Sequence, residues 1–145
     1  MKPPKEIVNG FIIFLAIGIY FLLMQVLNLT HIFYLRFLNV LFVFYGVNRT
    51  IQMNLNEGKK KFVSNATSAL FTSVIGVILS VIGLVIYSYL QQSDEFLQSL
   101  SETFLFGGKP SIDMYSISLL FEGIASSVIV TLLLMLYWNN QFSSD

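Results

Sequence analysis

The sequence contains no cysteine and a single histidine, His31, among its 145 residues. The absence of cysteine excludes disulfides, thiolate zinc sites and thiol redox chemistry. A single histidine excludes a multi-histidine metal site within one chain, and the scattered glycines form no phosphate-binding loop. We therefore expect the protein to use no metal and no cofactor.

Charge is the second scarce property. Charged residues make up 11% of the chain, hydrophobic residues make up 55%, and the formal net charge is zero. Globular chains are about a quarter charged, and a soluble fold this apolar would lack enough polar side chains to cover its surface. A balanced charge also argues against nucleic acid as a partner, because phosphate binding requires clustered Lys and Arg. The predicted solvent and first partner is the lipid bilayer.

Four long apolar runs divide the chain, each long enough to cross a hydrocarbon core that takes about 20 helical residues. We predict spans at about residues 7–29, 32–53, 66–90 and 112–138. The first run exceeds a signal-peptide core and no small-residue cleavage site follows it, so it should remain in the protein. The predicted fold class is an all-α integral membrane protein, a single domain over residues 1–145 that forms an antiparallel four-helix bundle.

A short amphipathic helix is predicted at about residues 94–106, in the loop between the third and fourth spans. Ser93 can cap it, and Asp94 and Glu95 in the first turn suit the positive end of the helix dipole. Its apolar residues, Phe96, Leu97, Leu100 and Phe104, fall on roughly one face. Such a helix lies on the membrane surface, either as a simple cover for the helix ends or as a lid over the spans.

The basic residues predict the orientation. Six of the seven that flank the spans, namely Lys2, Lys5, Arg49, Lys59, Lys60 and Lys61, fall on one side of the membrane, and Lys109 lies on the other. Lys and Arg are retained on the cytoplasmic side, so both termini should be cytoplasmic.

Two charges inside the spans form the candidate site. Arg36 in the second span and Glu122 in the fourth should lie at similar depths below the outer surface, and each alone would cost about 2.5 to 3.5 kcal/mol at the centre of a span. We therefore predict that they pair within an intramembrane polar cluster that also includes Gln25, Asn39 and Ser118. Three interpretations remain open: a pair that fixes helix register, a proton or cation site beneath an acidic outer loop, or a charge that a partner protein neutralises.

Small residues form a stripe along the third span. Ala69, Ser73, Gly76, Ser80 and Gly83 recur at spacings of four, three, four and three, and so share one helix face. Stripes of this kind let a neighbouring helix approach closely in lipid, within one bundle or between proteins.

Two functions follow from these features. The spans hold one acid, no deep histidine and no nucleophile with a base, so we expect no enzymatic activity. The first hypothesis is an accessory or scaffold subunit that acts through helix contacts with itself or another membrane protein. The alternative is a small transporter or channel component that uses Glu122 and Arg36, although Val43, Ile82 and Ile129 offer nothing to hydrate a path unless an oligomer builds one.

The middle of the chain resembles an uncharacterised family of small four-span bacterial membrane proteins, a domain of unknown function. The features that carry this resemblance are Tyr45-Gly46, a basic connection before Phe62, Tyr87 with Tyr89, and Asp94-Glu95-Phe96. The resemblance implies four helices and a bacterial cytoplasmic membrane. It implies no activity, cofactor or residue role.

Overall fold

The structure is a computed structural model that describes residues 2–91, 93–104 and 106–143. Within these residues the chain is all-helical and no strand is formed, which confirms the predicted all-α class. The helices are α1 (Lys5–Val26), α2 (Phe33–Arg36), α3 (Asn39–Asn56), α4 (Phe62–Gln91), α5 (Asp94–Glu102) and α6 (Ile112–Tyr137), followed by the 3₁₀ turn η1 (Asn139–Gln141).

Three of these helices, α1, α4 and α6, are long and apolar enough to cross a membrane. They contain 22, 30 and 26 residues, and each exceeds the roughly 20 residues that the hydrocarbon core requires. Their lipid-compatible surfaces carry many exposed large apolar side chains. The lengths and compositions are those of a membrane protein.

The second apolar run differs from the single helix predicted over residues 32–53. Helix α2 ends at Arg36 and α3 begins at Asn39, because the amides of Phe37 and Leu38 bond to carbonyls three residues back instead of four. The carbonyl of Leu35 accepts one of these bonds and also a bond of 2.9 Å from the Tyr20 hydroxyl of α1. The tightened turn contains no proline or glycine, so the sequence pattern did not reveal it.

Other helix ends also differ from the predicted spans. Helix α1 ends at Val26 because Asn28 adopts a φ of 57°, in the left-handed region that turns the chain. Helix α4 begins at Phe62, four residues before the predicted start. Helix α5 ends at Glu102 and is shorter than the predicted 94–106, of which residue 105 lies outside the described residues.

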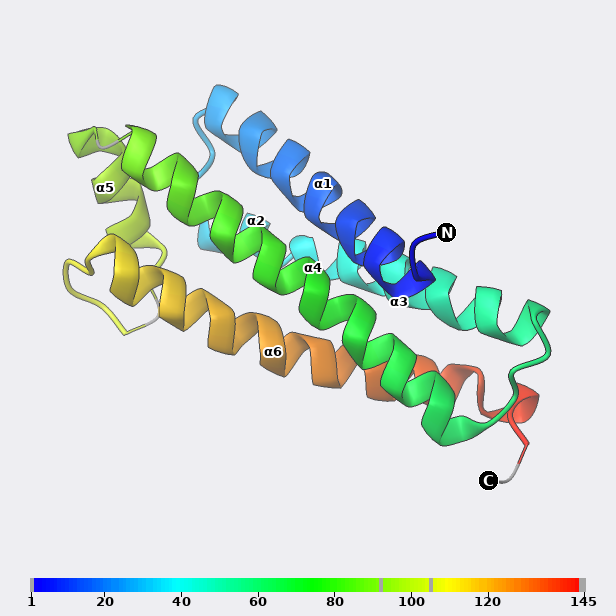
Figure 1. The fold of residues 1–145 in the computed structure, drawn as a ribbon. Coiled ribbons are helices and arrows are strands. Elements are labelled where there is room, and N and C mark those ends of the chain that lie inside the picture. Colours follow the sequence, from blue (N-terminus) through cyan, green and yellow to red (C-terminus); the bar gives the residue numbers. More distant parts are fainter. Residues whose placement is uncertain (1, 92, 105, 144–145) are drawn as a thin grey trace.

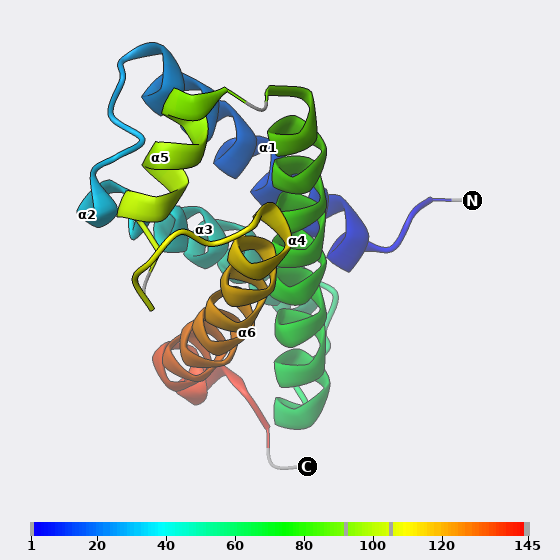
Figure 2. The same cartoon turned by 90° about the vertical axis from the view of Figure 1, so that its left-hand side faces the viewer.

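The long helices lie side by side, and α4 packs against α1, α3 and α6 (Figure 1). At one end, the start of α1 meets the end of α3 through Lys5 and Glu57, and the Phe62 ring of α4 packs 5.7 Å from that of Phe142. We call this the terminal end, since both chain termini lie toward it. Helices α2 and α5, with the last turns of α1 and α4, lie toward the opposite end, which we call the α5 end (Figure 2).

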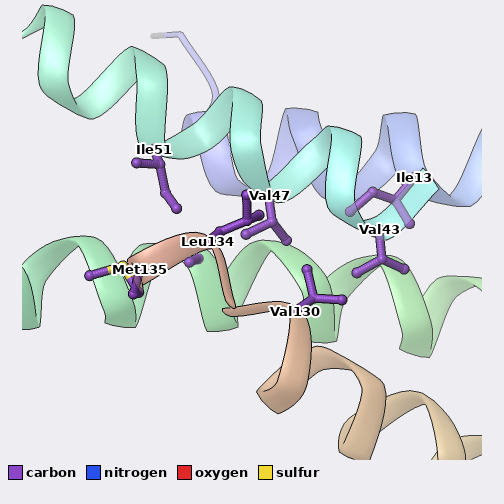
Figure 3. Close-up of a cluster of buried hydrophobic side chains, with 8 residues drawn as sticks. Ile13, Val43, Val47, Ile51, Val130, Leu134 and Met135 are labelled. Carbon is purple, nitrogen blue, oxygen red and sulfur yellow. The ribbon is translucent and has the colours of Figure 1, made fainter. Parts of the chain in front are cut away.

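The apolar core lies between α1, α3, α4 and α6 in the half nearer the terminal end. Its buried members are Ile13, Val43, Val47, Ile51, Ala69, Val130, Leu134 and Met135, most of which Figure 3 shows. Part of the small-residue stripe makes this packing possible. Ala69, Ser73 and Gly76 are buried, and a Cβ on Gly76 would lie 2.7 Å from the Cγ2 atom of Ile13. This part of the stripe therefore serves packing within the chain.

A buried hydrogen-bond network joins α1, α3 and α4 beside this core. Asn9 donates to the Thr50 hydroxyl at 2.8 Å, the Thr50 and Thr72 hydroxyls bond at 2.8 Å, and all three side chains are at most 1% exposed. Bonds between helices in lipid contribute about 0.6 kcal/mol each on average, and they are directional. The network therefore fixes the rotation of three helices relative to one another.

The charged contacts at the terminal end predict a pH dependence. The Lys5 ammonium, and then that of Lys59, donate to the half-exposed Glu57 carboxylate and lower its pKa below the usual 4.5. A lowered pKa in the folded state adds stability that is present above pH 4.5 and is lost as the pH falls through the folded-state pKa. We expect Glu57→Gln to lower the unfolding midpoint of the purified protein slightly at pH 7. The difference from the unsubstituted protein should vanish once the pH falls below the folded-state pKa of Glu57, and a difference that persists in strong acid would contradict the ion-pair origin.

Candidate functional site: an ion pair beside an apolar cavity

Arg36 is the last residue of α2 and stands at the tightened turn, at the α5 end of the bundle. Its Nη2 atom lies 3.0 and 3.3 Å from the two carboxylate oxygens of Glu122 on α6. Its Nη1 atom donates to the Thr103 carbonyl at 2.8 Å and to the Tyr115 hydroxyl at 3.0 Å. The guanidinium also lies 4.8 Å from the ring centre of Phe33, close enough for a cation–π contact. Arg36 thus joins α2, the end of α5 and α6.

Arg36 reaches Glu122 because one face of α6 lies toward α2 over two turns. Tyr115, Ser118 and Glu122 are spaced by three and four residues and therefore lie along that face. The Ser118 side chain is within hydrogen-bonding reach of the Glu122 carboxylate. The side chains of Arg36 and Glu122 are 15% and 28% exposed, so the pair is largely removed from solvent.

The structure brings together part of the predicted polar cluster. Arg36, Glu122 and Ser118 are in contact, as described above. Asn39 lines the same cavity as the pair, but its Oδ1 atom is buried without a hydrogen-bond partner among the described residues. Gln25 lies outside the cavity lining, and its Oε1 atom is likewise unpartnered within the described chain. Gln25 is therefore not joined to the ion pair.

Two partners of Arg36 were missed by the sequence analysis. Tyr115 was not included in the predicted cluster, although its spacing of seven residues from Glu122 puts both on one face of a helix. Thr103 contributes a backbone carbonyl just after the end of α5, and a carbonyl has no sequence signature. Cations favour the C-terminal end of a helix, so Arg36 also caps α5.

A cavity of about 660 Å³ opens beside the ion pair. We call it the α5 cavity. It lies between α1, the α2–α3 junction, α4 and α6, and α5 contributes Phe96, Ser99, Leu100 and Thr103 to its wall. Most of the lining is apolar, while Ser80 and Gly83 of the small-residue stripe also line it. The second part of the stripe thus borders the cavity, although a Cβ on Gly83 would still lie 3.0 Å from the Phe14 ring of α1.

The α5 cavity is closed toward the terminal end. Val43 belongs both to its lining and to the buried core, where Val47 and Val130 are fully buried behind it. On its other side the lining includes four side chains that are also exposed on the outer surface: Leu15, Ile19, Leu22 and Phe37. The cavity is therefore open at the apolar surface of α1 and the α2–α3 junction.

Helix α5 is held over the α5 cavity by aromatic packing. Phe96 is 2% exposed, and its ring lies 5.5 Å from that of Tyr87 on α4. Leu100 and Tyr115 complete this second apolar cluster. The Ser93 hydroxyl accepts from the Phe96 amide and caps the helix start, as predicted. The apolar face of α5 therefore lies against the bundle.

Searches of the chain against protein families, curated proteins and solved structures found no match. The resemblance to a four-span bacterial family stays a prediction. Within the described residues, no group of three or more His, Cys, Asp or Glu side chains is placed to hold a metal ion. Functional inference therefore depends on the ion pair and the α5 cavity.

Proposed function

We propose that this chain is a non-enzymatic, multi-pass membrane protein that holds one amphiphilic molecule from the bilayer in the α5 cavity. The observation that carries the proposal is the combination of a largely apolar cavity of about 660 Å³ with one ion pair in its wall. This volume lies within the roughly 300 to 1,000 Å³ typical of small-molecule sites. A ligand with an apolar body and one polar end matches both parts.

The energetics of an empty space support an occupant. An enclosed void costs about 24 cal/mol per Å³, so the enclosed part of this volume would cost several kcal/mol if it stayed empty. The net stability of a domain is only about 5 to 15 kcal/mol. Water is a poor filler, because an ordered water needs two to four polar partners and this lining is mostly apolar. Hydrocarbon from the bilayer fills it without that cost.

The membrane arrangement that we propose has four crossings. Helix α2, the tightened turn and α3 form one helical run over residues 33–56, which at about 1.5 Å per residue is roughly 36 Å long. This run packs against α1 and α4 and completes the four-helix bundle, with α5 in the outer loop. The cluster Lys59, Lys60 and Lys61 lies at the terminal end, which supports cytoplasmic termini in a bacterial cytoplasmic membrane.

One sequence feature, the small-residue stripe, favoured a scaffold role. The small-residue stripe is occupied by α1 contacts and by the cavity, so it offers no free face to another protein. A channel through one chain is disfavoured, since Val43, Val47 and Val130 close the path toward the terminal end. An accessory role that depends on a held amphiphile, or a carrier role, is compatible with the cavity.

The test is binding of radiolabelled dodecanol to the protein in phosphatidylcholine nanodiscs. We expect saturable binding of one molecule per chain above the level of empty nanodiscs. Gly18→Leu should weaken it at least tenfold, because Gly18 lines the cavity and a Cβ there meets nothing within 4 Å. Leu132→Phe adds bulk on the exposed surface of α6 and is the matched control. Equal binding by both variants, or none by the unsubstituted protein, would refute the proposal.

A further inference from the structure

We infer that the amphiphile in the α5 cavity carries a primary ammonium head, which donates its hydrogens to Glu122. The inference rests on the proposed function and specifies the class of ligand. It follows from counting hydrogen-bond donors and acceptors in the cavity wall.

The donors of Arg36 are largely committed. Both hydrogens of Nη1 are used by the Thr103 carbonyl and the Tyr115 hydroxyl, and Nη2 is directed to the Glu122 carboxylate. An anionic head group would have to displace Glu122 from this arrangement. It would also bring a second negative charge beside the carboxylate, and like charges in a desolvated contact are strongly unfavourable.

Two hydroxyls of the wall also donate their hydrogens elsewhere. Ser80 donates to the Gly76 carbonyl at 2.7 Å, and Ser99 donates to the Phe96 carbonyl at 2.7 Å. Each hydroxyl oxygen keeps acceptor lone pairs after its hydrogen is used. These side chains therefore offer acceptors and not donors to a ligand.

A stronger acceptor, a carboxylate, completes the wall. The Glu122 carboxylate has about four acceptor positions, and its side chain keeps 28% of its surface exposed after pairing with Arg36. An ammonium group carries three donors and no acceptor, and so matches this wall.

The charge around the α5 end favours the same class. The segment from α5 to the start of α6 carries Asp94, Glu95, Glu102 and Asp113 against one base, Lys109. An excess of one sign near a low-dielectric cleft raises the local concentration of the opposite ion. Because the Arg36–Glu122 pair is formally neutral, the surrounding field, with its negative excess, attracts a cationic head and repels an anionic one.

The experiment compares three radiolabelled probes with the same chain, dodecylamine, dodecanol and dodecanoate, on the protein in phosphatidylcholine nanodiscs at pH 7, with empty nanodiscs subtracted. We expect dodecylamine to bind about tenfold more tightly than dodecanoate, with dodecanol between them. In Glu122→Gln the preference for the amine should disappear.

The outcomes separate the two proposals. Saturable dodecanol binding without a preference for the amine over the carboxylate would overturn the ammonium inference and leave the proposed function standing. Preference for dodecanoate would overturn it as well. Failure of all three probes to bind the unsubstituted protein would overturn the proposed function, and this inference with it. The ranking is measured on the unsubstituted protein, so it holds even if a variant fails to fold.

Discussion

Replacing Glu122 by leucine is expected to lower the free energy of unfolding by about 3 kcal/mol, because it leaves Arg36 charged and unpaired beside an apolar cavity. Arg36→Met should have a similar effect, since it leaves the carboxylate alone and deprives the Thr103 carbonyl of its donor. The double variant Arg36→Met/Glu122→Leu should lie within about 1 kcal/mol of the unsubstituted protein, because apolar side chains of similar volume replace a buried pair at little cost.

The measurement is a double-mutant cycle from reversible denaturing-detergent titrations of the protein in mixed micelles. Glu102→Gln is the matched control. This carboxylate lies at the same end and accepts a long hydrogen bond of 3.4 Å from Gln98, so its replacement should change stability by less than about 0.5 kcal/mol. A double variant as unstable as the sum of the two single variants would show that the charges are energetically independent. In that case Arg36 and Glu122 would not act together as one site.

The same cycle separates a structural pair from a binding pair. A pair that only fixes helix register loses nothing but stability when both charges are removed together. A pair that also receives a ligand loses the preference for the ammonium probe in the double variant, even where stability is restored. Measuring stability and probe binding on one set of variants therefore distinguishes the interpretations that the sequence left open.

The sequence was informative about the elements that lipid dictates. Long uncharged runs predict α1, α4 and α6, because a backbone in hydrocarbon must satisfy its own hydrogen bonds within a helix. The capping residue Ser93 and the acidic first turn predicted the start of α5 for an equally local reason. The pairing of Arg36 with Glu122 also followed from elementary energetics, since two unpaired charges at one depth are costly.

What the sequence did not show depends on contacts between distant segments. The tightened turn after Arg36 involves the Tyr20 hydroxyl of another helix, and no local pattern marks it. The α5 cavity is a property of packing: at Gly76 the stripe closes on Ile13 of α1, whereas Ser80 and Gly83 border the cavity, with Gly83 close to the Phe14 ring. The spacing of small residues is the same in both places. Only the positions of the neighbouring helices separate contact from cavity.

The close approach of α1 and α4 gives the second large prediction. Gly76→Ala should lower the free energy of unfolding by about 1 to 3 kcal/mol, the usual cost of overpacking a tight contact. The added Cβ would lie 2.7 and 2.8 Å from Ile13 and 3.2 Å from the carbonyl oxygen of Gly10, a backbone atom that cannot rotate away. Gly18→Ala is the matched control in the neighbouring helix α1, where the new Cβ meets nothing within 4 Å.

At Gly18 the same substitution should raise stability by up to about 0.5 to 1 kcal/mol, because alanine loses less backbone entropy than glycine in a helix. The two variants should therefore differ in sign in the mixed-micelle titration. This contrast tests the geometry on which the α5 cavity depends, since α1 must touch α4 at Gly76 and leave open space beside Gly18. If both glycines accepted alanine equally well, α1 would not be seated against α4 as described. The part of α1 that carries Gly18 and Tyr20 would then not form the cavity wall beside Arg36.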